Sequence, residues 1–193
     1  MKDPRRAEWR TPRDFWAVID KEFNFDIDVA ATPENALCRM NSTKQGDTLR
    51  AAHSWFPFVG GGILSGIGVE KKRFLAAYCN PPFGNMTEWI TKARSEVAAT
   101  KGSVAVVLCR CAPSTNWWKA ACAGDAKLAV EIRLLKPRVN FEPPPGIQAT
   151  GGNDQEMAMF VFRHRRFVED HVDLIINNWE WRQPKARRKR KGK

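Results

Sequence analysis

Four consecutive residues, Asn80-Pro81-Pro82-Phe83, are the part of the chain best suited to chemistry. The Asn80 side-chain oxygen and the Pro81 carbonyl oxygen can each accept a hydrogen bond from one N–H group of a conjugated amine. Such contacts favour a more tetrahedral nitrogen, whose lone pair is then free to attack an electrophile. Two successive prolines stiffen the backbone and hold the acceptors in place before the reaction. The Phe83 ring can stack on a planar base.

The same tetrapeptide could also be a plain turn, so its surroundings matter. The preceding residues 74–79 form a nearly continuous apolar run, which predicts a strand buried on both faces. Residues 86–99 follow with an apolar stripe at helical spacing, to which Trp89 belongs as a core residue. Ligands of α/β sheets bind beyond the carboxyl ends of the strands. The place of Asn80 after a buried strand therefore favours a site over a turn.

The rest of the chain alternates strand-like and helix-like segments. A helix is predicted over residues 13–20, with Thr11 as its N-cap and Pro12 at its first position. A second helix is predicted over residues 117–123, and strands are predicted over residues 23–31, 104–108, 128–134 and 157–162. This alternation indicates an α/β fold with a mostly parallel twisted sheet and helices on both faces. We expect one domain over residues 1–168 and a C-terminal extension over residues 169–193.

Positive charge is concentrated at the end of the chain. The net charge is +11, and residues 182–193 contain eight Lys or Arg and no acidic residue. We expect this basic tail to be disordered and to contact phosphates of a nucleic acid without sequence preference. A tail that only improves solubility is the alternative.

Several classes of protein are disfavoured. No apolar stretch is long enough for a membrane helix, and no secretory signal is present, so we expect a cytoplasmic protein. The five cysteines are irregularly spaced, which predicts reduced thiols and no metal site. Residues 60–68 contain five glycines but match no phosphate-binding pattern, so we interpret them as a connecting loop or a lid.

The order of several motifs resembles the phage-type Dam family of DNA N6-adenine methyltransferases. The resemblance covers about residues 8–163. The motifs that carry it are Trp9-Arg10-Thr11-Pro12, residues 25–31 with Asn35, Trp55, Cys79-Asn80-Pro81-Pro82-Phe83, residues 106–108, Ser114-Thr115-Asn116-Trp117-Trp118 and Arg138-Val139-Asn140-Phe141.

The resemblance implies a Rossmann-like class I fold that uses S-adenosylmethionine to methylate the exocyclic amine of an adenine flipped out of double-stranded DNA. It implies a phage or prophage enzyme that acts in the bacterial cytoplasm without a metal. Asn80, Pro81, Pro82 and Phe83 would form the catalytic motif. The implied cofactor-binding residues, with Asp28-Val29-Ala30-Ala31 in place of the usual glycine-rich loop, are Trp9, Thr11, Pro12, Asp28, Ala30, Asn35 and Asp47.

Three other functions stay open at the level of the sequence. The substrate could be the N4 amine of cytosine or an adenine in RNA, although Asn at position 80 favours adenine. A degenerate, non-catalytic DNA-binding module with the same fold is the third. Trp179 and Trp181 could stack on bases or cover a sheet edge, and the loop over residues 136–155 is the candidate for sequence recognition.

Overall fold

The computed structural model describes residues 9–41, 48–56, 75–82, 84–143, 146, 154–165 and 173–182. The predictions for Asp47, Phe83, the glycine-rich residues 60–68 and the basic residues 183–193 lie outside these ranges.

The helices of the described chain are α1 (Arg13–Phe23), α2 (Met86–Ala99) and α3 (Asn116–Ala121). Helix α2 buries Trp89, Ile90, Ala93 and Val97, one stripe at helical spacing, and its bounds are those predicted. Helix α1 buries Phe15 and Ile19 and ends at Phe23; its C-cap Asn24 adopts the left-handed conformation with φ of 50°. Among the described residues, no helix is long and apolar enough to cross a membrane.

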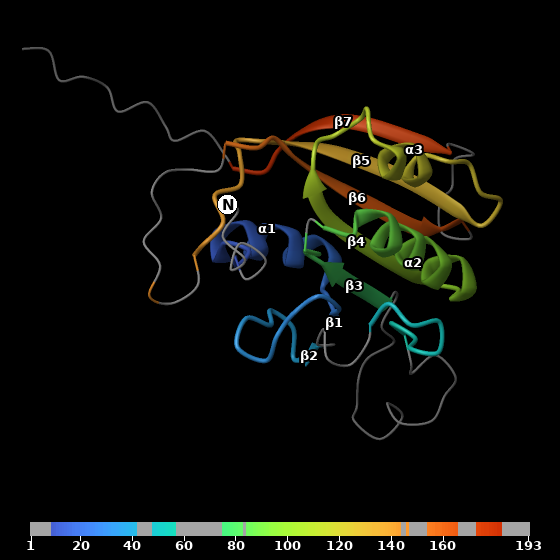
Figure 1. Cartoon of the computed structure of the whole chain (residues 1–193), viewed down its shortest axis with the longest axis horizontal. Helices are drawn as coiled ribbons and strands as arrows, with labels where there is room; N and C mark the ends of the chain where they lie inside the picture. The colour runs from blue at the N-terminus through green and yellow to red at the C-terminus, as the bar shows by residue number, and fades with distance from the viewer. Residues whose placement is uncertain are drawn as a thin grey trace, which may run out of the picture.

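The strands of the described chain form one sheet, drawn in Figure 1. They are β1 (Ile27–Asp28), β2 (Met40–Asn41), β3 (Leu75–Cys79), β4 (Ser103–Arg110), β5 (Leu128–Lys136), β6 (Met157–His164) and β7 (Leu174–Glu180). Strand β1 is much shorter than the predicted segment 23–31, while β4, β5 and β6 each extend beyond their predicted ends. Strand β7 lies within the segment 169–193 that the sequence assigned to an extension, so the sheet continues past residue 168.

The strand order across the sheet is β2-β1-β3-β4-β6-β5-β7. Strand β6 runs antiparallel to both of its neighbours, and all other pairs of neighbouring strands are parallel. From β1 the chain passes to β2 on one side and later to β3 on the other side. The order therefore reverses between β1 and β3, and an α/β sheet binds ligands beyond the carboxyl ends of the strands at such a point.

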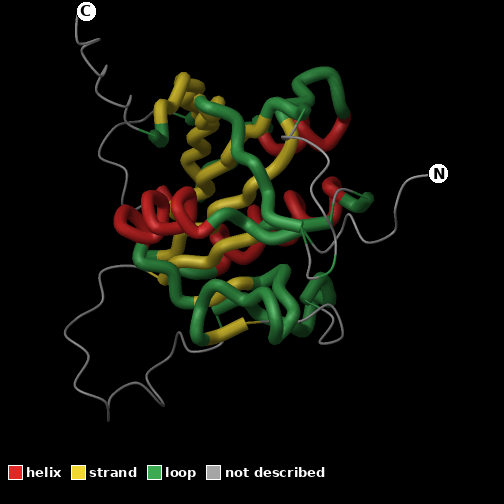
Figure 2. Tube along the Cα trace, turned by 90° about the vertical axis from the view of Figure 1, so that its left-hand side faces the viewer, coloured by secondary structure: helices red, strands yellow, loops and turns green. Residues whose placement is uncertain are grey.

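Helices cover both faces of the sheet, as Figure 2 shows. On one face, α2 and α3 pack over a core that includes Ala77, Cys79, Ala105, Val107 and Phe160. On the other face, α1 packs over a core that includes Ala76, Tyr78, Val104, Val106 and Met159. Successive residues of β3 and β4 thus enter opposite cores, as the pleat of a strand requires. The predicted Rossmann-like α/β fold is confirmed.

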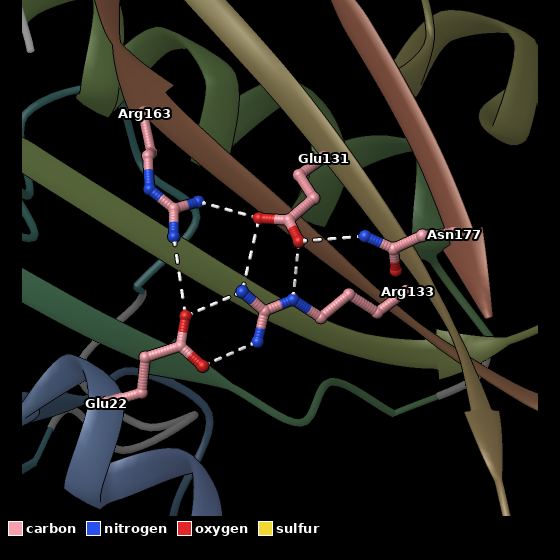
Figure 3. A network of polar contacts seen from close by, with 5 residues as sticks. All are labelled: Glu22, Glu131, Arg133, Arg163 and Asn177. Carbon is pink, nitrogen blue, oxygen red and sulfur yellow. Dashed lines mark hydrogen bonds and ion pairs between the residues drawn. The ribbon is translucent and has the colours of Figure 1, made fainter. Parts of the chain in front are cut away.

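A polar network ties α1 to the distal strands (Figure 3). Arg133 on β5 is 7% exposed and binds both Glu22 on α1 and Glu131 on its own strand. Arg163 on β6 binds the same two glutamates, and Asn177 on β7 donates to Glu131. The two positive and two negative charges balance within the network, which lowers the free energy needed to bury them.

Candidate active site

Two polar residues lie at the carboxyl ends of the neighbouring strands between which the strand order reverses. Asp28 ends β1 and pairs with Tyr78 of β3, and the Val29 amide beyond it donates to the Tyr78 carbonyl at 2.9 Å. Asn80 follows the end of β3 and is half-buried. The structure therefore brings Asp28 and Asn80 to the same edge of the sheet.

Thr11 lies at the same edge and contacts the Asn80 side chain. The Asn80 amide nitrogen Nδ2 donates to the Thr11 hydroxyl at 3.3 Å, and the Thr11 hydroxyl lies 2.7 Å from that of Tyr78. The prediction that Thr11 is the N-cap of the first helix is wrong. Pro12 occupies the N-cap position and its carbonyl accepts from the Trp16 amide, while the Thr11 hydroxyl is used by residues 67 and 69 positions further along the chain.

Tyr78 is a site residue that the sequence did not reveal, because it stands within an apolar run. Its side chain is fully buried, and its ring packs against those of Trp16 and Phe25 at centroid distances of 5.0 and 5.4 Å. Burial raises the pKa of the phenol well above its ordinary value, although the hydrogen bond with Thr11 opposes the shift. Tyr78 is therefore a neutral hydroxyl group at the base of the site.

The Asp28 carboxylate holds the loop that follows β1. Its Oδ1 accepts from the Ala30 amide at 3.4 Å and its Oδ2 accepts from the Leu37 amide at 3.2 Å. Burial raises the pKa of Asp28 from 3.8 to about 6, against the lowering effect of these two hydrogen bonds. With that pKa the group is about 90% ionised at pH 7. Each oxygen has a second lone pair, so the carboxylate can still accept from a bound ligand.

The other predicted cofactor residues are placed less closely together. The Asn35 side-chain oxygen accepts from the Thr32 amide at 2.6 Å, which closes a turn within the loop that Asp28 holds. Pro12 is buried at the start of α1. Trp9 is half-buried next to Arg10, whose backbone exchanges two hydrogen bonds with Glu142, and the contacts of the described residues do not link Trp9 to Asp28 or Asn80.

The segment around Trp55 is fixed to α2 by a buried ion pair. Lys92 and Glu96 lie one helical turn apart with 2.6 Å between Nζ and Oε1, and both are less than a tenth exposed. Glu96 accepts from the Trp55 amide at 2.9 Å, and Lys92 donates to the carbonyl of His53 at 2.7 Å. Lys92 and Glu96 therefore each hydrogen-bond to the backbone of the segment that contains Trp55. This buried ion pair could not be predicted from the sequence, because charged helix residues usually face water.

Two prolines of the predicted catalytic motif and three tryptophans complete the comparison with the sequence. Pro81 is buried and Pro82 is half-buried directly after Asn80. Trp89 and Trp118 lie in the core, which confirms the prediction that Trp89 is a core residue. Trp181 is also buried, with its ring 5.1 Å from that of Phe15 and its Nε1 donating to the Pro137 carbonyl.

The buried cysteines of β3 and β4 carry neutral thiols. Burial raises the pKa of the Cys79 thiol well above its ordinary value, and the nearby Asp28 charge adds to the shift. The same cause keeps Cys109 protonated. Within the described ranges, His, Cys, Asp and Glu side chains form no group of three that could hold a metal ion.

Comparisons with protein families and with solved structures both find similar proteins. A family model described as DNA N-6-adenine-methyltransferase (Dam) matches residues 1–183. Among solved structures, the chain is similar to a predicted O-methyltransferase from Agrobacterium tumefaciens, with 21% identity and a TM-score of 0.33 over 53% of this chain and 40% of that chain. No curated protein matches the chain.

Proposed function

Because the chain belongs to the DNA N-6-adenine-methyltransferase (Dam) family, we propose that S-adenosylmethionine is its methyl donor and that its target adenine is flipped out of double-stranded DNA. Family membership makes the protein an adenine-specific DNA methyltransferase. The donor, the flipped base and the residues that bind each of them are the parts that this proposal adds.

The observation that carries the proposal is the hydrogen bond from Asn80 Nδ2 to Thr11. With its nitrogen held by Thr11, the Asn80 amide keeps its oxygen Oδ1 for a donor outside the protein. An adenine amine that donates to Oδ1 and to the Pro81 carbonyl has both of its N–H groups held by acceptors. Its lone pair is then directed away from the ring system and towards the methyl donor. Pro81 and Pro82 restrict the backbone, so this geometry exists before the substrate binds.

The residues around Asp28 fit the proposed donor. S-Adenosylmethionine supplies a methyl group on a positively charged sulfur, which needs placement in line with the amine rather than further activation. Asp28 is a buried carboxylate, ionised at neutral pH, at the point where the strand order reverses. A negative charge at this position favours a cationic ligand, and its spare lone pairs can accept from hydroxyl or ammonium groups. We propose that Thr11, Pro12, Ala30 and Asn35 line the same site, with contributions from Trp9 and Asp47.

The adenine must leave the base stack to reach Asn80. Enzymes that modify a base inside a duplex rotate it into a pocket, where hydrogen bonds and aromatic stacking replace base pairing. We propose that Phe83 supplies the stacking ring and that the basic residues 182–193 hold the phosphates. A phage or prophage origin and action in the host cytoplasm remain predictions from the sequence.

The test is methyl transfer by Asn80→Ala to duplex DNA in the presence of S-adenosylmethionine, with the product nucleosides identified by mass spectrometry. We expect the wild-type protein to produce N6-methyladenine and the variant to lose at least a hundredfold in kcat, because one of two acceptors is missing. Binding of the methyl donor, measured by calorimetry, should stay within about threefold. Asn178→Ala, an exposed asparagine on β7, is the matched control and should retain full activity.

Three other results would each contradict a different part of the proposed function. N4-methylcytosine as the product, or transfer to RNA alone, would replace the proposed substrate. DNA binding without affinity for the donor would indicate a non-catalytic module. Near wild-type activity of Asn80→Ala would show that the catalytic group lies elsewhere.

A further inference from the structure

Two buried hydroxyl groups lie beneath the Asn80 side chain. The Thr11 side chain, 4% exposed, accepts from Asn80 Nδ2 and shares a 2.7 Å hydrogen bond with Tyr78. Tyr78 is fully buried. The three polar groups therefore form a chain that runs from the core to the surface, and Asn80 is its outermost member.

The fold explains why these three residues meet. Side chains of a strand alternate between its two faces, so Tyr78 enters the core beneath α1 while Cys79 enters the opposite core. Thr11 precedes α1, and this helix crosses the same face as Tyr78. The start of α1 is thus placed over the carboxyl end of β3. Any shift of α1 along the sheet would separate Thr11 from both partners.

Packing alone does not account for the hydroxyl of Tyr78. Its ring is held by Trp16 and Phe25, and a phenylalanine would keep both ring contacts. A buried hydroxyl is unfavourable unless it forms a hydrogen bond. The partner that the described residues offer is Thr11. The same reasoning applies to Thr11, because valine has nearly the same shape without the polar atom.

We propose that Thr11 and Tyr78 are positioning residues that fix the orientation of the Asn80 amide. This inference rests on the proposed role of Asn80 in binding the adenine amine. The oxygen and the nitrogen of a carboxamide are similar in size, so the amide fits its site in two orientations. Only one of them presents an acceptor to the amine, and the other presents N–H groups that oppose those of adenine. In this proposal the Thr11 hydroxyl donates its proton to the Tyr78 oxygen, so towards Asn80 it can only accept a hydrogen bond, and it thereby selects the orientation that presents Nδ2.

The first test measures kcat and KM of Tyr78→Phe and Thr11→Val. We expect a three- to tenfold loss in kcat for each variant, in line with the net contribution of one hydrogen bond. Tyr78→Phe should leave KM for both substrates within about twofold, because its hydroxyl lies below the site. Thr11→Ser keeps the hydroxyl and should restore kcat. The double variant should lose little more than either single variant, since the two hydroxyls act in series.

A matched control separates positioning from the general loss of a buried hydroxyl. Ser103 is 2% exposed at the start of β4, and its hydroxyl donates to the Thr100 carbonyl. Ser103→Ala should lower thermal stability by an amount similar to Tyr78→Phe but leave kcat unchanged. Equal losses of kcat in both variants would reduce the effect to stability and overturn the inference.

A second measurement observes the amide itself. In protein labelled with 15N-asparagine, the Asn80 side-chain resonances are assigned by their loss in Asn80→Ala. Thr11→Val should shift the Hδ2 resonances upfield and speed their exchange with water, while Ser103→Ala should not. Unchanged resonances in Thr11→Val, or kcat within twofold of wild type for both hydroxyl variants, would refute the inference even if Asn80→Ala is inactive. If Asn80→Ala remains active, the proposed function fails instead, and the resonances still report whether the amide is anchored.

Discussion

The buried Asp28 carboxylate should make the stability of the protein fall as the pH rises. Its pKa is about 6 in the folded protein and 3.8 in its ordinary state. Between these values the folded protein binds more protons than the unfolded chain, so the free energy of unfolding decreases with increasing pH. The full difference corresponds to roughly 3 kcal/mol, because one pKa unit is worth about 1.4 kcal/mol. This stability is fully present below pH 3.8 and is lost above pH 6.

Asp28→Asn isolates this effect from all other titrations. The variant cannot ionise, so the difference in unfolding free energy between it and the wild type contains the Asp28 contribution. That difference should move by about 2 kcal/mol in favour of the variant between pH 4.5 and pH 8. An amide accepts from one of the two backbone N–H groups that Asp28 holds, so a constant loss of about 1 kcal/mol should appear at every pH.

Urea denaturation at closely spaced pH values, followed by fluorescence of the eight tryptophans, measures this difference. Asp154→Asn, at an exposed position, serves as the control for removal of a carboxylate as such. A difference between Asp28→Asn and wild type that is flat within about 0.5 kcal/mol, or that moves the other way, would refute the reasoning. Asp28 would then be as well solvated in the folded protein as in the unfolded chain.

Three further perturbations test the buried ion pair, the polar network and the basic C-terminal residues. Lys92→Met leaves the buried Glu96 without its ion-pair partner and should lower the free energy of unfolding by about 3 kcal/mol, measured by urea denaturation; a loss below 1 kcal/mol would show that the ion pair contributes little to stability. Arg133→Ala should destabilise the protein more than Arg163→Ala in the same assay, because Arg133 is the more buried and binds both glutamates at shorter distances; the reverse order would contradict the network. Removal of residues 183–193 should weaken DNA binding and flatten its dependence on salt, since fewer counterions are released; an unchanged slope in a binding titration would make these residues bystanders.

Local patterns in the sequence were sufficient for the elements that bury a regular stripe. The bounds of α2 follow from apolar residues at helical spacing, and β3 follows from an unbroken apolar run. Strand β7 was missed because Ile175 and Ile176 are both exposed, so its residues follow neither an alternating nor a continuous apolar pattern. Strand β1 was predicted too long, because the apolar alternation continues on both sides of Ile27 and Asp28, whereas Phe23 belongs to α1 and only Ile27 and Asp28 pair with neighbouring strands.

The places of the candidate site residues in the fold could be predicted from the sequence, but their contacts could not. Placing Asp28 and Asn80 at strand ends needs only the order of elements and the rule for ligand sites in α/β sheets. Thr11 was misassigned because its type suits a helix cap and its true partners are 67 and 69 positions away. Tyr78 could not be distinguished from its apolar neighbours, because a tyrosine in a buried strand shows its function only through the group that its hydroxyl meets.

The end position of β7 also has a consequence for handling the protein at high concentration. Among the described residues, β7 pairs with β5 on one side, and Ile175 and Ile176 are 44% and 55% exposed. A strand with an unpaired backbone edge and exposed branched apolar side chains is a template for association with a second chain. At the opposite end of the sheet, β2 is two residues long and offers little edge to pair with. A lysine in place of Ile176 should therefore raise the solubility of the protein, and it would do so at the far end of the sheet from Asn80.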